Sequence, residues 1–142
     1  MERTERLLDE VRLLWHAMVR VGERLHAEEP VTLGMRAVLE FVSLGGPATV
    51  PQVARSRGVT RQHVQELVNA LLALELVALE ANPAHRRSAL VCLTSEGRKV
   101  IERMRRRERR LFERIDLEGK AGGLESAART LKEVRRALGG TP

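Results

Sequence analysis

The stretch that decides the fold is TVPQVARSRGVTRQHVQELVNALLAL, residues 49–74. Thr49 and Gln52 have the spacing of a capping box, so a short helix is expected to begin there. Gly58 is suited to end that helix in a left-handed conformation. Thr60 can then cap a second, longer helix. Two helices joined by a glycine-containing turn are typical of a helix-turn-helix, which reads DNA through its second helix.

Further helices are expected on both sides of this motif. Apolar residues recur at near-heptad spacing over residues 5–27 and again over about 123–138, which predicts two amphipathic helices. A helix capped by Thr32 precedes the motif, and a long helix capped by Thr94 is expected to run to about Ile115.

Two short extended segments lie between the motif and the long helix. Residues 76–80 and 89–93 are largely apolar, and Asn82-Pro83 between them favours a turn, so a hairpin is expected. The element order predicts a mainly α fold with a small β wing, a winged helix-turn-helix with N- and C-terminal dimerisation helices. We divide the chain into an N-terminal helix, the winged helix-turn-helix and the C-terminal helices, over residues 1–30, 31–96 and 97–142.

The charge of the chain is positive and unevenly distributed. Lys and Arg number 25 against 19 Asp and Glu, a net charge of +6 over 142 residues. Residues 82–110 hold ten Lys or Arg and three Glu, a local +7, whereas residues 1–46 hold six Arg and eight acids, a local −2. The positive excess favours an acidic partner, either nucleic acid or a membrane surface. Aromatic residues make up only 2%, which argues against modules that stack bases on aromatic side chains.

Cysteine usage and hydropathy indicate a cytoplasmic protein without a membrane partner. Cys92 is the one cysteine, which excludes an internal disulfide and a cysteine zinc cluster and suits a reducing compartment. Alternation along its strand points this side chain outward. No apolar run has the length of a membrane span, and the charged N-terminus is unlike a signal peptide.

No motif in the sequence predicts an enzyme. The glycine-rich phosphate loops and the nucleophile elbow are missing, and no two of the four histidines lie within one helical turn. We therefore expect no catalytic residue, no metal and no cofactor.

The second helix of the motif presents two different faces. The face expected to pack inward is apolar and holds Val64, Leu67, Val68 and Leu71. The opposite face holds Arg61, Gln62, Gln65 and Asn69. Arginine pairs with guanine, and asparagine or glutamine with adenine, because each presents two groups spaced like a base edge in the major groove. An ordinary solvated face is the alternative, but the amide-rich composition after a capped helix and a glycine turn favours DNA recognition.

The tip of the expected hairpin carries His85, Arg86 and Arg87. A wing beside a recognition helix lies over the minor groove, where the negative potential attracts arginine. We expect one of the two arginines to contact DNA and the other to serve the wing structurally; mere solubilisation of the turn is the alternative. The arginines at 103, 106, 107 and 110 share a helix face, which we interpret as a solvated face with i,i+4 partners.

Together these features resemble the multiple antibiotic resistance regulator (MarR) family of winged-helix transcription factors. The matching segments lie within about residues 30–100 and are LGMRAVL (33–39), VARSRGVTRQHV (53–64), LVNAL (67–71), NPAHRR (82–87) and LTSEG (93–97). The Arg-Arg wing followed by Leu-Thr-x-x-Gly is the more specific part. His85 departs from the family, which usually has an acid there that pairs with a wing arginine.

The resemblance implies a homodimer on a pseudo-palindromic operator, usually a repressor, which in many members is released by a small aromatic or phenolic ligand. The family's DNA contacts map onto Thr60, Arg61, Gln62, Gln65, Arg86 and Arg87. Peroxide-sensing members have a cysteine in the first helix, which this chain lacks, so redox sensing is not expected.

The terminal helices carry more apolar residues than a small winged helix can cover. We therefore expect a dimer seam, with intrachain packing as the alternative, through Leu7, Val11, Leu14, Leu111, Phe112, Ile115, Leu124, Leu131, Val134 and Leu138. A candidate ligand pocket, for which plain core packing is the alternative, is formed by Trp15, His16, Met18, Met35 and Met104.

Three functions are consistent with the sequence. The first is a dimeric, sequence-specific transcriptional regulator, a repressor relieved by a small-molecule ligand. The second is a weakly specific or architectural DNA-binding protein without an effector, which the positive charge suits. The third is a winged-helix protein-interaction module, which the loss of the wing acid at His85 would allow.

Overall fold

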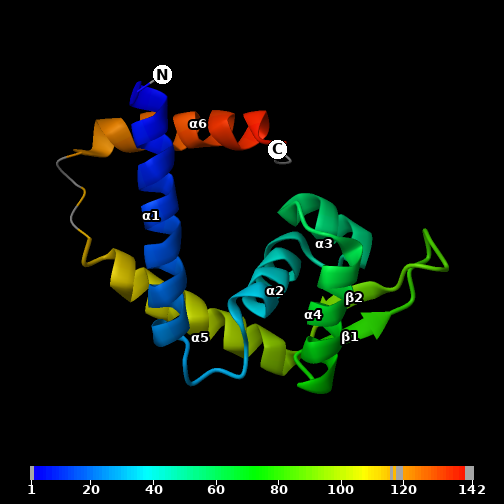
Figure 1. Cartoon of the computed structure of the whole chain (residues 1–142). Coiled ribbons are helices and arrows are strands. Elements are labelled where there is room, and N and C mark those ends of the chain that lie inside the picture. The colour runs from blue at the N-terminus through cyan, green and yellow to red at the C-terminus, as the bar shows by residue number, and fades with distance from the viewer. Residues whose placement is uncertain (1, 116, 118–119, 140–142) are drawn as a thin grey trace.

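A computed structural model describes residues 2–115, 117 and 120–139. Its elements are α1 (Glu2–Leu25), α2 (Leu33–Gly45), α3 (Val50–Arg57), α4 (Arg61–Ala73), β1 (Val77–Glu80), β2 (Leu90–Leu93), α5 (Ser95–Phe112) and α6 (Ala121–Ala137). In Figure 1, α6 and the N-terminal end of α1 lie at one end of the molecule, and the β1–β2 hairpin projects from the other. The expected mainly α fold with a two-stranded wing is confirmed.

Threonine caps fix where four of the helices begin. The side chains of Thr32, Thr49, Thr60 and Thr94 each accept a hydrogen bond from the backbone N–H three residues on. The backbone N–H of Thr49 in turn donates to the side-chain oxygen of Gln52, which completes the capping box. Gly58 has φ 65° and ends α3 in the left-handed conformation, as expected. Each cap contributes on the order of 1 kcal/mol, so these boundaries follow from local chemistry.

The hydrophobic core lies within the winged helix-turn-helix and the first half of α5. Its largest fully buried side chains are Leu39, Leu71, Ile101 and Met104, contributed by α2, α4 and α5. Val91 of β2 also belongs to it, and an isolated bridge between Ala48 and Val91 ties the loop before α3 to the hairpin. By contrast, none of the side chains in α1 is buried. The recognition motif is therefore held by a core that α1 does not share.

The base of the hairpin is a close backbone contact. β1 and β2 pair antiparallel with Val77 opposite Leu93, one residue inside the expected start of the first strand. A Cβ on Gly97 would lie 1.9 Å from the carbonyl oxygen of Leu76, so α5 approaches β1 as only glycine allows. Thr94 secures the same junction, because its Oγ1 donates to Glu75 O over 2.7 Å and its N–H donates to Leu76 O over 3.2 Å.

Cys92 is buried, although alternation along the strand pointed its side chain outward. It lies on the strand face opposite Val91, and Glu80, diagonal to it across the β1–β2 pairing, shares that face and interacts with the thiol. Burial raises the pKa of the Cys92 thiol, and the Glu80 carboxylate raises it further. The thiol is therefore protonated and unreactive at neutral pH.

The long helix ends three residues earlier than expected. α5 stops at Phe112, and the N–H groups of Arg114 and Ile115 bond three residues back in a turn. Ile115 thus lies beyond the helix. None of the helices in the described ranges combines the length and apolarity needed to cross a membrane.

Candidate nucleic-acid interface

The two faces of α4 are divided as the sequence predicts. Val64, Val68 and Leu71 are buried, whereas the opposite face is exposed and carries Arg61, Gln62, Gln65 and Asn69. Gln65 Nε2 donates to Asn69 Oδ1 over 2.9 Å, which pairs the two amides one helical turn apart. The pairing leaves the Gln65 carbonyl oxygen and the Asn69 amide hydrogens on the open side, where they can meet base edges.

The wing tip is a double turn that holds three exposed side chains, His85, Arg86 and Arg87. Asn82 Oδ1 accepts from Ala84 N over 3.1 Å, and Ser88 N donates to His85 O over 3.2 Å. Within the described residues neither arginine forms an ion pair with a carboxylate. Both guanidinium groups are available to an external anion.

A groove joins the recognition helix to the wing. It has a volume of about 410 Å³ and is lined by Val50, Pro51, Arg61, Gln62, Gln65, Leu79, Arg87, Ser88 and Ala89. Arg61 comes from α4 and Arg87 from the hairpin, and the lining residues include no carboxylate. The groove is therefore positive and presents hydrogen-bonding side chains, as a surface for nucleic acid requires.

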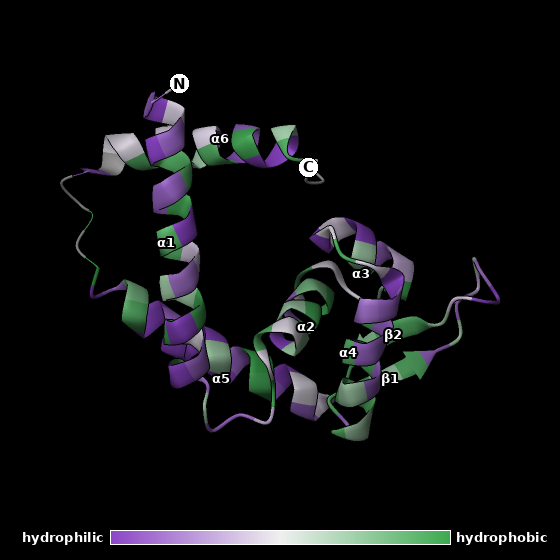
Figure 2. Ribbon diagram, viewed as in Figure 1, coloured by the Kyte–Doolittle hydropathy of each residue, from purple (hydrophilic) through white to green (hydrophobic). Residues whose placement is uncertain are grey.

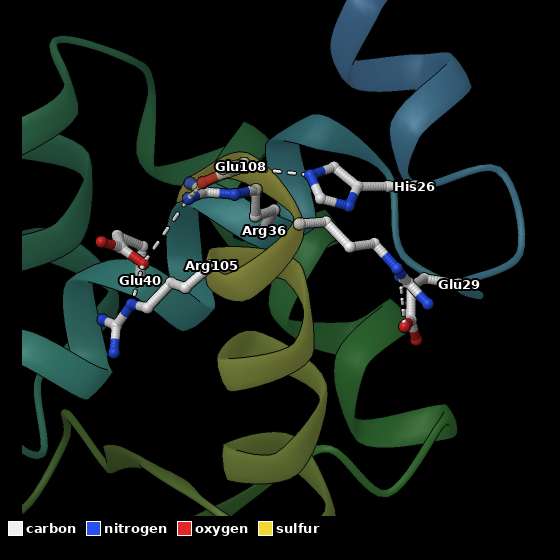
Figure 3. A network of polar contacts seen from close by, with 7 residues as sticks. His26, Glu29, Arg36, Glu40, Arg105 and Glu108 are labelled. Atoms are coloured by element: carbon white, nitrogen blue, oxygen red, sulfur yellow. Dashed lines mark hydrogen bonds and ion pairs between the residues drawn. The ribbon is translucent and has the colours of Figure 1, made fainter. Parts of the chain in front are cut away.

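On the α5 face interpreted as solvated, Arg103 and Arg107 bind an acid of the same chain, whereas Arg106 and Arg110 are exposed. Arg103 donates two hydrogen bonds, of 3.1 and 3.0 Å, to the carboxylate of Glu29, and Arg107 Nη1 lies 2.7 Å from Glu29 Oε1. Arg105 Nε donates to Glu40 over 2.9 Å (Figure 3). The local +7 of residues 82–110 is thus partly neutralised by the acidic N-terminal third.

A second branch of this network contains His26, which the sequence did not single out beyond excluding a metal pair. His26 Nε2 lies 2.9 Å from Glu108 Oε1, and Arg36 of α2 donates to the other oxygen of Glu108 (Figure 3). The charge asymmetry between residues 1–46 and 82–110 signals that such pairs exist, but it does not identify the partners.

We expect Glu29 to make stability fall in acid. Its hydrogen bond from Arg103 lowers the pKa of the Glu29 carboxyl, Arg107 lowers it further, and burial only partly opposes them. A lowered folded-state pKa adds stability above the unfolded value of 4.5, and this stability is lost as the pH falls through the folded value. Urea unfolding of Glu29→Gln at pH 7 should show a loss of about 1–3 kcal/mol.

The same variant should also show a flatter stability profile than the wild type below pH 4.5. Glu28→Gln is the matched control, since Glu28 is exposed beside Glu29. Equal profiles for Glu29→Gln and the wild type would show that the pair with Arg103 and Arg107 adds nothing to stability.

A second cleft, of about 930 Å³, lies between α1 and the helices of the DNA-binding part. Its largely apolar wall includes Trp15, Val19, Val31, Leu33, Val38, Val53, Val59, Val64 and Leu67, with Glu23, His26, Glu29, Arg57 and His63 as its titratable side chains. Of the residues expected to form a ligand pocket, only Trp15 lines it. His16 and Met18 are exposed elsewhere on α1, and Met35 and Met104 are buried in the core.

Hydrophobic residues recur along α1, the end of α5 and α6 (Figure 2). Many of their side chains are exposed, and we call these exposed apolar side chains the terminal apolar surface. Trp15 is 64% exposed and Leu138 is 77% exposed. Of the expected dimer residues, Leu7, Val11, Leu111 and Val134 are half-buried, and those exposed are Leu14, Phe112, Ile115, Leu124, Leu131 and Leu138. Nothing in the described part of the chain covers this surface.

Comparison with known proteins identifies the family of the chain. The model of the MarR family matches residues 36–88, which span α2 to the wing tip. The uncharacterized protein Rv2011c of Mycobacterium tuberculosis is 42% identical over 97 residues, which are 68% of this chain and 67% of the relative.

No group of three or more His, Cys, Asp or Glu residues able to hold a metal ion occurs among the residues described.

Solved structures share the whole fold. The MarR family transcription regulator SP03579 has a TM-score of 0.82 and 27% identity, covering 97% of this chain and 95% of its own. Staphylococcus aureus MarR, in complex with salicylate and kanamycin, has a TM-score of 0.81 and 12% identity, covering 96% of this chain and 93% of its own. The repressor CouR, bound to a 23-mer DNA duplex, has a TM-score of 0.77 and 21% identity, covering 92% of this chain and 95% of its own. The chain belongs to the MarR family of winged-helix, DNA-binding transcriptional regulators, which are not enzymes.

Proposed function

We propose that the chain acts as a homodimer that binds a pseudo-palindromic operator in double-stranded DNA and represses transcription until a small-molecule ligand releases it. The observation that carries the proposal is the positive groove between α4 and the wing, with Arg61 and Arg87 in its wall. CouR is a repressor bound to a DNA duplex, and S. aureus MarR binds salicylate. Both have this fold, which makes the same pair of activities a reasonable proposal here.

The groove suggests a division of roles among its residues. Arg61 at the first turn of α4 reads guanine through its forked guanidinium, and the amide pair of Gln65 and Asn69 reads adenine, with Gln62 beside them. Thr60 and the free N–H groups of the first turn hold a phosphate. Arg87 faces the groove from the wing, while Arg86 and His85 extend the contact toward the minor groove.

Dimer formation is supported by the terminal apolar surface. A monomer would leave the apolar side chains of α1 and α6 in water, whereas a two-fold dimer covers the same patch on both subunits. Such a dimer sets the two recognition helices about 34–36 Å apart, one turn of DNA.

Sedimentation should give twice the chain mass of 15.9 kDa. Leu131→Asp should shift the equilibrium toward monomer by at least tenfold, since burying a leucine is worth about 1.5–3 kcal/mol. A monomeric wild type at micromolar concentration would refute the dimer.

The apolar cleft beside α1 is the proposed ligand site. His63, Val64 and Leu67 form part of its wall and belong to α4, whose outer face carries the DNA-reading side chains. A small aromatic or phenolic ligand in the cleft therefore contacts α4 on the face opposite its DNA-reading side chains. Such a ligand can shift α4 relative to the recognition helix of the second subunit.

DNA binding measured by fluorescence anisotropy tests the proposal. A fragment of the protein's own promoter region is competed with random DNA at two salt concentrations. Preference for the promoter supports a sequence-specific regulator, and a ligand that abolishes the preference supports relief of repression. Equal, steeply salt-dependent binding to both fragments favours an architectural protein or an operator elsewhere in the genome, and no binding at either salt favours a protein-interaction module.

The wing makes its own contribution to salt dependence. Replacing Arg86 and Arg87 together by alanine should flatten the slope of log K against log salt by about 0.9 for each phosphate that the wing no longer neutralises. The matched control replaces Arg3 and Arg6 by alanine. Both arginines are exposed and lie at the N-terminal end of α1, away from the wing. An unchanged slope in the wing variant would show that the wing does not touch the phosphates.

A further inference from the structure

The wing tip carries one exposed side chain whose charge depends on pH, His85. Its backbone shapes the turn, because its N–H donates to Asn82 O over 3.1 Å and its carbonyl oxygen accepts from Ser88 N over 3.2 Å. Its imidazole ring has no partner among the described residues. In Figure 1 the tip of the hairpin extends past the helices. The ring is therefore not used to build the wing and is open to a molecule that approaches the tip.

The charged groups that share this side of the molecule with His85 are arginines. Arg86 and Arg87 follow it on the same turn, and neither forms an ion pair within the described residues. Arg61 lies on α4, in the wall of the groove that Arg87 also lines. A proton on His85 thus adds to a surface that is already positive.

The wing supplies no carboxylate to balance that proton. The sequence from Ala81 to Ser95 contains neither Asp nor Glu, and none of the groove-lining residues is acidic. Glu80 lies at the end of β1, opposite Leu90, and its carboxylate interacts with the thiol of Cys92. An imidazolium at the tip must therefore find its counter-charge outside the chain.

A DNA duplex provides that counter-charge. Its phosphates are anionic, and the negative potential of a narrow minor groove attracts arginine, lysine and histidine. An imidazole changes its charge between about pH 5 and 8, and a nearby negative charge favours the protonated form. Because coupling between two bound species is reciprocal, DNA that favours the proton is itself bound more tightly when the proton is present.

We propose that His85 is a proton-dependent DNA contact, whose imidazolium donates to a phosphate beside the minor groove, so that each subunit takes up a proton as it binds DNA. The inference rests on the proposed DNA-binding role of the wing and adds a control by acidity. As the pH falls through the range of histidine, the contact gains its charge and affinity rises. As the pH rises, the neutral ring loses the ionic part of the contact.

The other histidines have different surroundings. His26 is buried and bonded to Glu108, and His16 is exposed on α1. His63 is exposed on α4 and lines the cleft beside α1. Because α4 also carries the base-reading side chains, His63 is the histidine from which the effect of His85 must be separated.

Anisotropy titrations of the full-length protein at about pH 5.5 and about pH 8 test the proposal. The probes are the promoter fragment and a random duplex, because phosphates are present in every sequence. The wild type should bind both about tenfold more tightly at the lower pH, since each of two exposed ion contacts in the dimer contributes about threefold. The slope of log K against log salt should also steepen at the lower pH, by about 0.9 for each phosphate that an imidazolium neutralises.

Two substitutions fix the charge of this position. His85→Gln should bind as weakly at both pH values as the wild type does at the higher one. His85→Arg should bind at both about as tightly as the wild type does at the lower one, with the steeper salt slope throughout. His16→Gln, on the exposed surface of α1, is the matched control and should keep the wild-type response. A structural role for His85 would move affinity in both variants without removing its dependence on pH.

Three results would overturn the inference. They are a wild type whose affinity and salt slope ignore pH, a full response in His85→Gln, and a response that only His63→Gln removes. Preference for the promoter over random DNA at a single pH tests the proposed function separately. Selective binding that ignores pH defeats this inference alone, whereas no binding to either duplex at either pH defeats the proposed function as well.

Discussion

Gly97→Ala should destabilise the protein by at least about 3 kcal/mol, measured as the free energy of unfolding in urea. The new Cβ would lie 1.9 Å from the carbonyl oxygen of Leu76, a backbone atom that cannot rotate away. Relief therefore requires α5 and β1 to separate. That movement would also break the bonds from Thr94 to Glu75 O and Leu76 O.

Gly45→Ala is the control for this substitution. Gly45 also lies in a helix, but nothing is found within 4 Å of a Cβ built there, so its replacement should leave stability unchanged or raise it slightly. If Gly97→Ala unfolded at the same urea concentration as Gly45→Ala, the close approach of α5 to β1 would not hold the wing in solution.

Arg61→Ala should weaken binding to the operator by about 1–3 kcal/mol and change binding to random DNA much less. The guanidinium stands at the start of α4 in the wall of the groove, where a base edge can take both of its hydrogen bonds. Anisotropy titrations of both DNAs under one salt condition measure the difference.

Arg20→Ala, an exposed arginine on α1, controls for the loss of one positive charge. This variant should bind operator and random DNA slightly more weakly than the wild type, and the loss should be equal for both. An equal loss on operator and random DNA in the Arg61 variant would assign this side chain to the phosphate backbone instead of a base.

The features that the sequence predicted best are those decided by neighbours along the chain. The caps at Thr32, Thr49, Thr60 and Thr94 and the left-handed Gly58 depend on residues within one helical turn, so spacing alone identified them. The division of α4 into a buried and an exposed face followed from helical periodicity in the same way.

The features that were missed depend on contacts between distant residues. Glu29 is 74 positions from Arg103, and no local pattern reports that a carboxylate in the loop after α1 meets the basic face of α5. The burial of Cys92 was missed for a related reason, because it depends on how the hairpin packs in three dimensions and not on alternation along one strand. Met35 and Met104 were taken as pocket residues, but their helices pack them into the core.

The lack of any buried side chain in α1 has a consequence for how the amount of protein is sensed. In the proposed dimer, the apolar seam of α1 is covered only after two chains have met, so the DNA-binding species grows with the square of the chain concentration when that concentration is low. Halving the number of copies per cell would then cut the occupied operators by up to fourfold. A gene under such control would respond to the regulator's own abundance as well as to a ligand.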